Sequence, residues 1–63
     1  MKIREVLDRL RRDGWVVVRI KGSHRQLRHP VKAGLVTVAG HPNDDLAPGT
    51  LRSILRLADL EER

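Results

Sequence analysis

The sequence predicts an α+β fold in a single small domain, residues 1–63, with the chain order α-β-β-β-α and a three-stranded antiparallel sheet. Two observations support this fold. Apolar residues recur with a helical period near each end of the chain, and three short stretches typical of strands, separated by glycine-containing turns, lie between them. Because each helix carries an apolar stripe on one side only, we expect both helices to cover the same face of the sheet.

The first helix is predicted over residues 3–12. Its apolar residues follow the spacing i, i+3, i+4 and i+7, which places them on one side of a helix: Ile3, Val6, Leu7 and Leu10. Gly14 stands where a left-handed residue commonly ends a helix, so we expect the helix to stop just before it.

The first and third strands are predicted from runs rich in β-branched residues. "WVVVRI", residues 15–20, lies between two glycines and is too short and too rich in valine for a helix. "LVTVA", residues 35–39, follows a Lys-Ala-Gly turn and has the same character. Short turns join these runs to the middle strand, so the three strands should form an antiparallel meander.

The middle strand is predicted over "HRQLRH", residues 24–29, where side chains alternate between two faces. Leu27 marks the face that points to the core, and Pro30 ends the strand. One face therefore carries His24, Gln26 and Arg28, and the other carries Arg25, Leu27 and His29.

The second helix is predicted over residues 48–58, after a loop of helix-breaking residues, "GHPNDDLAPGT". Pro48 suits the first helical turn, where its missing N–H costs nothing. Asp44 and Asp45 are expected to favour the positive N-terminal end of this helix. The charged end, residues 61–63, is expected to fray. The helical period is restored by Leu51, Ile54, Leu55 and Ala58.

The charge balance points to polyanions as partners. Lys and Arg number 13 against 8 Asp and Glu, which gives a formal net charge of +5 and an isoelectric point of about 11.1. Most of these bases are arginine, whose planar fork suits phosphate groups. The plainer interpretation is that the charge only keeps a small protein soluble, and charge alone does not name the partner.

Composition also limits the kinds of site and the location. The chain has no cysteine, so disulfides and thiolate metal sites are excluded. No stretch reaches the roughly 18 apolar residues of a membrane span, and charged residues interrupt the N-terminus. We therefore expect a cytoplasmic protein without a membrane anchor, a metal or another cofactor.

The histidines His24, His29 and His41 are the side chains that titrate nearest neutral pH. His24 and His29 are an odd number of residues apart on one strand, so they should point to opposite faces and share no metal. Ser23 precedes His24 directly, which does not favour a hydrolytic pair; Ser23 more simply closes a turn or contacts a phosphate. His29 is expected to be structural.

One chemistry needs only a single histidine among cations. RNA carries its own nucleophile, the 2′-hydroxyl, so cleavage requires a proton-transfer group and positive charge near the phosphate. His24 with Lys21, Arg25 and Arg28 offers this combination without a metal, and the expected product is a 2′,3′-cyclic phosphate. The alternative is that His24 is a solvated histidine on a strand.

The string "KGSHRQLRHPVKAGLVTVAGHPNDDLAPGTLRSIL", with "DGWVVVR" before it, resembles the HicA family of toxins, the ribonuclease half of HicA–HicB toxin–antitoxin pairs. The resemblance covers residues 3–60. It implies a fold like the double-stranded-RNA-binding domain, mRNA cleavage that arrests translation, and a HicB-like antitoxin that covers the active face. It also implies that His24, in the motif Gly22-Ser23-His24, is catalytic.

On this interpretation the basic and turn residues around His24 bind the RNA phosphate: Lys21, Gly22, Ser23, Arg25 and Arg28. His41 matches the family's second block and is a candidate for a substrate contact or a supporting role. The chain departs from the family where aromatics are usual, at Leu27 and Val16, and both exchanges are expected to concern the core. It also has Asp59 where glycine is common, and aspartate tolerates a left-handed helix end.

Two other interpretations stand beside the ribonuclease. A non-catalytic module that binds duplex RNA has the same element order, but such a module normally has lysines at the N-terminus of its last helix, whereas this chain has the acidic "NDDLAPGT". The other is a subunit whose main task is to bind its antitoxin, with activity only when released, and it does not compete with the ribonuclease. The expected partners are therefore mRNA and a HicB-like antitoxin with an acidic contact surface, in a homo- or hetero-oligomer.

Overall fold

The computed structural model describes residues 1–60; the charged end at 61–63, predicted to fray, lies outside the described residues. The chain order confirms the predicted α-β-β-β-α fold. Within residues 1–60, no helix is long and apolar enough to cross a membrane. The elements are α1 (Ile3–Asp13), β1 (Val16–Lys21), β2 (His24–Arg28), β3 (Val36–Ala39) and α2 (Pro48–Leu57).

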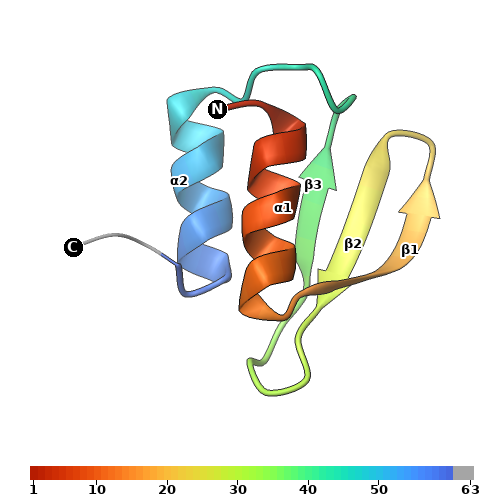
Figure 1. The fold of residues 1–63 in the computed structure, drawn as a ribbon, viewed down its shortest axis with the longest axis vertical. Helices are drawn as coiled ribbons and strands as arrows, with labels where there is room; N and C mark the ends of the chain where they lie inside the picture. Colours follow the sequence, from red (N-terminus) through yellow and green to blue (C-terminus); the bar gives the residue numbers. More distant parts are fainter. Residues whose placement is uncertain (61–63) are drawn as a thin grey trace.

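The sheet has the strand order β1-β2-β3, and both neighbouring pairs are antiparallel. Both helices lie side by side over one face of this sheet (Figure 1). Within residues 1–60, the other face carries no helix, as the one-sided apolar stripes of α1 and α2 predict. The uncovered face is therefore the place where polar side chains can gather without costing core packing.

The core lies between the helices and the covered face of the sheet. Leu27, at the centre of the middle strand, is fully buried, so this exchange does concern the core. Val16 is 58% exposed, so the expectation that its exchange concerns the core is wrong: Val16 lies on the uncovered face of an edge strand. The buried residues are Ile3, Val6, Leu7, Leu10, Trp15, Leu27, Val36, Val38, Ile54 and Ala58.

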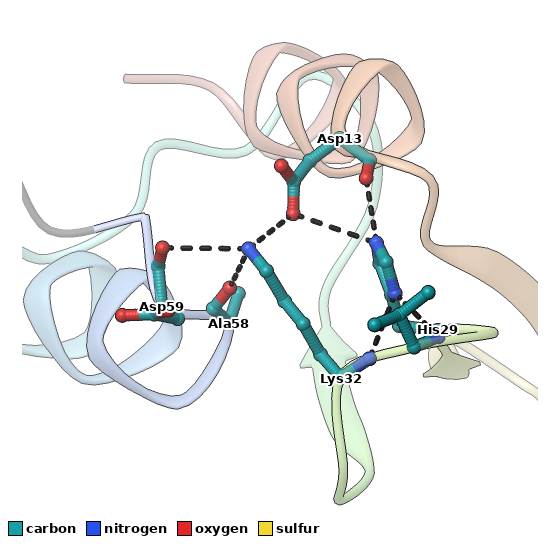
Figure 2. A network of polar contacts seen from close by, with 6 residues as sticks. Asp13, His29, Lys32, Ala58 and Asp59 are labelled. Carbon is teal, nitrogen blue, oxygen red and sulfur yellow. Dashed lines mark hydrogen bonds and ion pairs between the residues drawn. The ribbon is translucent and has the colours of Figure 1, made fainter.

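The ammonium group of Lys32, in the β2–β3 loop, joins the ends of both helices. Its Nζ donates to the Asp13 carboxylate at 2.6 Å, at the end of α1. It also donates to the backbone carbonyl oxygens of Ala58 at 2.9 Å and Asp59 at 3.4 Å, just after α2 (Figure 2). A cation at a helix C-terminus also interacts favourably with the helix dipole, so one side chain holds three segments together.

The imidazole of His29 also binds at this junction of the two helix ends and the β2–β3 loop. His29 therefore has the structural role that was predicted for it. Its Nδ1 accepts hydrogen bonds from the backbone N–H groups of Val31 and Lys32, each at 3.0 Å. Its Nε2 lies 2.6 Å from the carbonyl oxygen of Asp13 (Figure 2). Since Nδ1 is an acceptor twice, we assign the proton to Nε2, which donates to Asp13.

Gly14 lets the chain pass close to this histidine. It has φ of 107°, the left-handed conformation predicted for it, and a Cβ there would lie only 2.8 Å from Nε2 of His29. The next residue, Trp15, meets the same imidazole edge to face at 5.3 Å. Trp15 is 1% exposed and belongs to the core.

The C-terminal end of α2 also agrees with prediction. Asp59 adopts φ of 56°, the left-handed conformation that its position requires. The next N–H, from Leu60, donates to the carbonyl of Leu55 at 2.7 Å, which satisfies a carbonyl at the end of the helix. At the other end, Pro48 is in the first turn, as predicted.

The predicted role of Asp44 and Asp45 is wrong. The residue before α2 is Ala47, which makes no side-chain cap, and neither carboxylate lies in the first turn. The loop instead packs against the start of α1, where the carbonyl of Asp44 accepts from the N–H of Ile3 at 2.9 Å. Asp45 pairs with Lys2 at 3.6 Å, so the loop supplies partners for α1 rather than for α2.

Asp13→Asn should remove part of the acid sensitivity of the fold. The pKa of Asp13 lies below its usual 3.8, chiefly because Lys32 donates a hydrogen bond to the carboxylate; desolvation opposes this, and the charge of Lys32 reinforces it. A lowered folded-state pKa means that the stabilisation is fully present above the unfolded value and is lost as pH falls through the folded value. Urea unfolding should therefore show the wild-type advantage over Asp13→Asn shrinking below about pH 4.

The Lys32→Met background is the control. Without the ammonium donor, Asp13→Asn should change the pH dependence of the unfolding free energy much less than it does in the wild type. Parallel stability curves for wild type and Asp13→Asn down to about pH 2 would contradict this account.

Candidate functional site

One unpaired residue in β1 changes which face its side chains reach. Val17 pairs with Leu27 and Arg19 pairs with Gln26, so Val18 lies between the two pairs without a partner of its own. An extra residue of this kind is a β-bulge, and it reverses the alternation of side chains along the strand. The two halves of β1 therefore serve different faces of the sheet.

Before the bulge, Trp15 and Val17 face the helices: Trp15 is buried and Val17 packs against the core. After it, Arg19 and Lys21 point to the uncovered face. In a strand without a bulge, these four odd-numbered residues would share one face. The bulge thus allows the aromatic ring to be buried while both cations remain on the uncovered face.

A hollow of about 310 Å³ lies on the uncovered face, and we call it the sheet hollow. Lys21 pairs across the strands with His24, and in the next row Gln26 stands between Arg19 and Thr37. On the other side of His24 is Ala39, whose methyl group leaves the histidine unobstructed. The side chains that line the sheet hollow are Arg19, Lys21, His24, Gln26 and Thr37.

The sheet hollow is positive, and its polar groups are unused. Two of the lining residues are cations and none is a carboxylate. Across residues 1–60, none of the five side chains has a hydrogen bond or ion pair with another residue of the chain. By contrast, the two hollows beside α1 each include Glu5 and Asp8. The sheet hollow is therefore the better place for an anion.

The structure brings two of the predicted site residues together, Lys21 and His24, and it builds the turn beside them from two others. Gly22 has φ of 59°, which a glycine adopts without strain. The carbonyl of Ser23 accepts from the N–H of Gly40 at 3.1 Å. The Ser23 hydroxyl makes no hydrogen bond to His24 in the described part of the chain, so the pair is not arranged as a nucleophile and base.

Arg25 and Arg28 are placed differently. Arg25 points away from the sheet hollow, and its guanidinium donates to the carbonyl of Gly40 at 3.1 Å. Arg28 pairs with Val16 at the far end of β2 and does not line the sheet hollow. Neither guanidinium therefore accompanies His24 in this hollow.

The loop after β3 leaves the sheet at the same end as the β1–β2 turn (Figure 1). His41 belongs to this loop, two residues after the end of β3. It is exposed and does not line the sheet hollow. Its backbone N–H donates to the Asp44 carboxylate at 3.0 Å, which shapes the loop. Among residues 1–60, no three His, Asp or Glu side chains are grouped to hold a metal ion.

The sequence patterns did not predict a role for three of the lining residues: Arg19, Gln26 and Thr37. For Arg19, however, the sequence does contain a signal. The odd-numbered positions of β1 are apolar at first and charged from Arg19 onward, which conflicts with one face serving a core. That conflict is the signal of a bulge, and it would have placed Arg19 beside His24.

These features define a small basic α+β protein that presents a histidine and two cations on the uncovered face of a sheet. A family model described as "HicA toxin of bacterial toxin-antitoxin" matches residues 3–60. The chain therefore belongs to the HicA toxin family, the family that its sequence resembles. It is a toxin of a toxin–antitoxin system, and membership implies an antitoxin partner. A comparison with curated proteins finds no match.

Arg25→Gln and Lys21→Gln form a matched pair, because each removes one positive charge from a neighbouring position. Arg25→Gln loses a partly buried hydrogen bond to Gly40 and should lower the free energy of unfolding by about 1 kcal/mol. The Lys21 side chain has no hydrogen bond or ion pair within residues 1–60, so Lys21→Gln should change the free energy of unfolding by less than about 0.5 kcal/mol. Urea unfolding followed by circular dichroism measures both, and equal losses would count against the different placement of the two side chains.

Proposed function

We propose that this toxin is a metal-independent endoribonuclease that cleaves mRNA, with His24 as its catalytic residue. The observation that carries the proposal is the pairing of His24 with Lys21 in a hollow that holds a second cation, Arg19, and no carboxylate. Membership of a toxin family supports it, because mRNA cleavage arrests translation and so harms the cell.

The reaction needs no group beyond RNA and the chain. The 2′-oxygen of one nucleotide attacks the adjacent phosphorus, a P–O2′ bond forms, and the P–O5′ bond breaks to leave a 2′,3′-cyclic phosphate. One proton leaves the 2′-hydroxyl and one reaches the 5′-oxygen. His24 acts in this exchange as the general acid or the general base.

Positive charge near the phosphate also contributes to the rate enhancement. Negative charge grows on the phosphoryl oxygens as the 2′-oxygen attacks, and fixed cations favour that state over the starting one. Lys21 stands directly across from His24, so an ammonium group is available beside the reacting phosphate. With Arg25 committed to Gly40, Lys21 and Arg19 are the cations of the site.

The alternative, a module that binds duplex RNA without cutting it, fits less well. Duplex RNA is bound through phosphates across its grooves, which requires cations spread over an extended surface. The segment before α2 carries Asp44 and Asp45 and ends in Ala47, and the first turn of α2 has no basic residue. Arg19 and Lys21 instead stand at one small hollow, which suits a single-stranded segment.

His24→Ala should lower the rate of RNA cleavage by about 10²- to 10⁴-fold, the usual contribution of a general acid–base residue. The substrate is a labelled single-stranded RNA in EDTA, and the end groups are identified as cyclic phosphates. His41→Ala is the matched control: it removes an exposed histidine outside the sheet hollow and should reduce the rate far less.

Circular dichroism must show that both variants are folded. If His24→Ala cuts RNA as fast as the wild type, the proposed catalytic role is wrong. If the wild type and His24→Ala both bind RNA and neither cuts it, the chain is an RNA-binding module. A loss in His41→Ala as large as that in His24→Ala would assign His41 to proton transfer as well.

The antitoxin partner is proposed to be a HicB-like protein that covers the sheet hollow with an acidic surface. Attraction between unlike charges weakens as salt screens them, so affinity should fall when ionic strength rises from about 0.05 to about 0.5 M. Isothermal titration of toxin into antitoxin measures this, and Lys21→Gln should reduce the salt dependence. An affinity that does not change with salt would contradict the acidic surface.

A further inference from the structure

We propose that the sheet hollow contains a subsite for one nucleotide of single-stranded RNA, in which Gln26 and Thr37 contact the base and Arg19 binds its phosphate. This inference rests on the proposed function, because it assigns a nucleotide next to the one cleaved at His24. It concerns binding, however, and is tested without cleavage.

The subsite follows from the register of the strands. Arg19, Gln26 and Thr37 stand in one row across β1, β2 and β3, each directly paired with the next. The row that contains His24 and Lys21 is the neighbouring one on the same face. Positions two residues apart on a strand are separated by about 7 Å, close to the spacing of successive phosphates in an extended RNA strand.

The side chains of this row suit a base and its phosphate. Gln26 is half-buried, and its amide presents a hydrogen-bond donor beside an acceptor. Thr37 adds a hydroxyl that can donate or accept. Neither side chain has a partner in residues 1–60. A base edge, which also presents donors and acceptors side by side, supplies the partners that they lack.

Arg19 suits the phosphate of the same nucleotide. A guanidinium binds two phosphate oxygens through parallel hydrogen bonds, which a lysine does not. Arg19 is exposed and lies at the edge of the sheet, whereas the guanidinium of Arg25 is held by Gly40 on the other side. The bulge at Val18 is what brings Arg19 to this row.

The size and composition of the hollow limit the ligand. A volume of about 310 Å³ is at the lower end for small-ligand sites and suits one nucleotide rather than a duplex. The only aromatic residue of the chain, Trp15, is 1% exposed. Trp15 is therefore not available to stack on the base, and the base edge is recognised through hydrogen bonds.

The test is a titration of the full chain with each of the four ribonucleoside 3′-monophosphates, followed by amide chemical shifts. The wild type should prefer one or two bases by about tenfold, the discrimination that a bidentate base contact provides. Gln26→Ala should reduce that preference to less than about twofold. Arg19→Gln should weaken all four nucleotides alike and keep the preference, while Arg52→Gln, an exposed arginine on α2, should change nothing.

Equal affinity of the wild type for all four nucleotides, no binding at all, or an unchanged preference in Gln26→Ala would each overturn the inference. If Gln26→Ala does not fold, Thr37→Val replaces it with the same expectation. Loss of the proposed function is a separate result: His24-independent cleavage overturns the catalytic role and leaves the base preference intact, whereas equal binding with His24-dependent cleavage overturns only the subsite.

Discussion

Val18, the unpaired residue of β1, is the constraint on which both faces of the sheet depend. A chain this short has one core, and the largest side chain available to it is Trp15, which must be buried. Without the bulge, burial of Trp15 and Val17 would turn Arg19 and Lys21 to the helix side of the sheet, away from His24. One additional residue separates the two requirements, so the strand closes the core and still supplies cations to the uncovered face.

The second constraint is at the opposite end of the sheet from the β1–β2 turn. Two helix ends and a loop meet there, and each leaves backbone carbonyls that need donors. Lys32 and His29 supply those donors to Asp13, Ala58 and Asp59. This junction holds the helices over one face of the sheet while the sheet hollow lies on the other, so the groups that join the helix ends are separate from those that line the hollow.

Much of the fold could be predicted from the sequence because its elements are separated by clear signals. Each signal reflects a local conformational preference, and the structure has the predicted conformation at each of them: the two helical periods, Gly14, Pro48 and Asp59. The observed ends of the helices and strands lie within one residue of the predicted ends, which is the usual uncertainty for ends that fray. The role of Asp44 was predicted wrongly because the loop packs on α1. This contact joins segments that are distant in the sequence, so no local sequence pattern predicts it.

The site was less predictable, for a physical reason. His24 and Lys21 are close in sequence, so a short turn is enough to pair them. Arg25 is just as close, yet side-chain alternation sends it to the other face, where Gly40 accepts its hydrogen bond. Arg19 and Thr37 reach the sheet hollow only through strand register and a bulge, which depend on how the whole sheet is assembled.

The unused polar groups of the sheet hollow also have a consequence for the cell that makes this toxin. Because these side chains make no hydrogen bonds or ion pairs within residues 1–60, replacing His24 should leave the chain folded, and under the proposed function it would leave the chain inactive. Such a chain would keep Arg19 and Lys21, the cations of the surface that the antitoxin is proposed to cover. If both proposals hold, an inactive copy produced beside an intact one would occupy antitoxin and release active toxin, so an inactivating mutation in one gene copy would increase the harm done by the other.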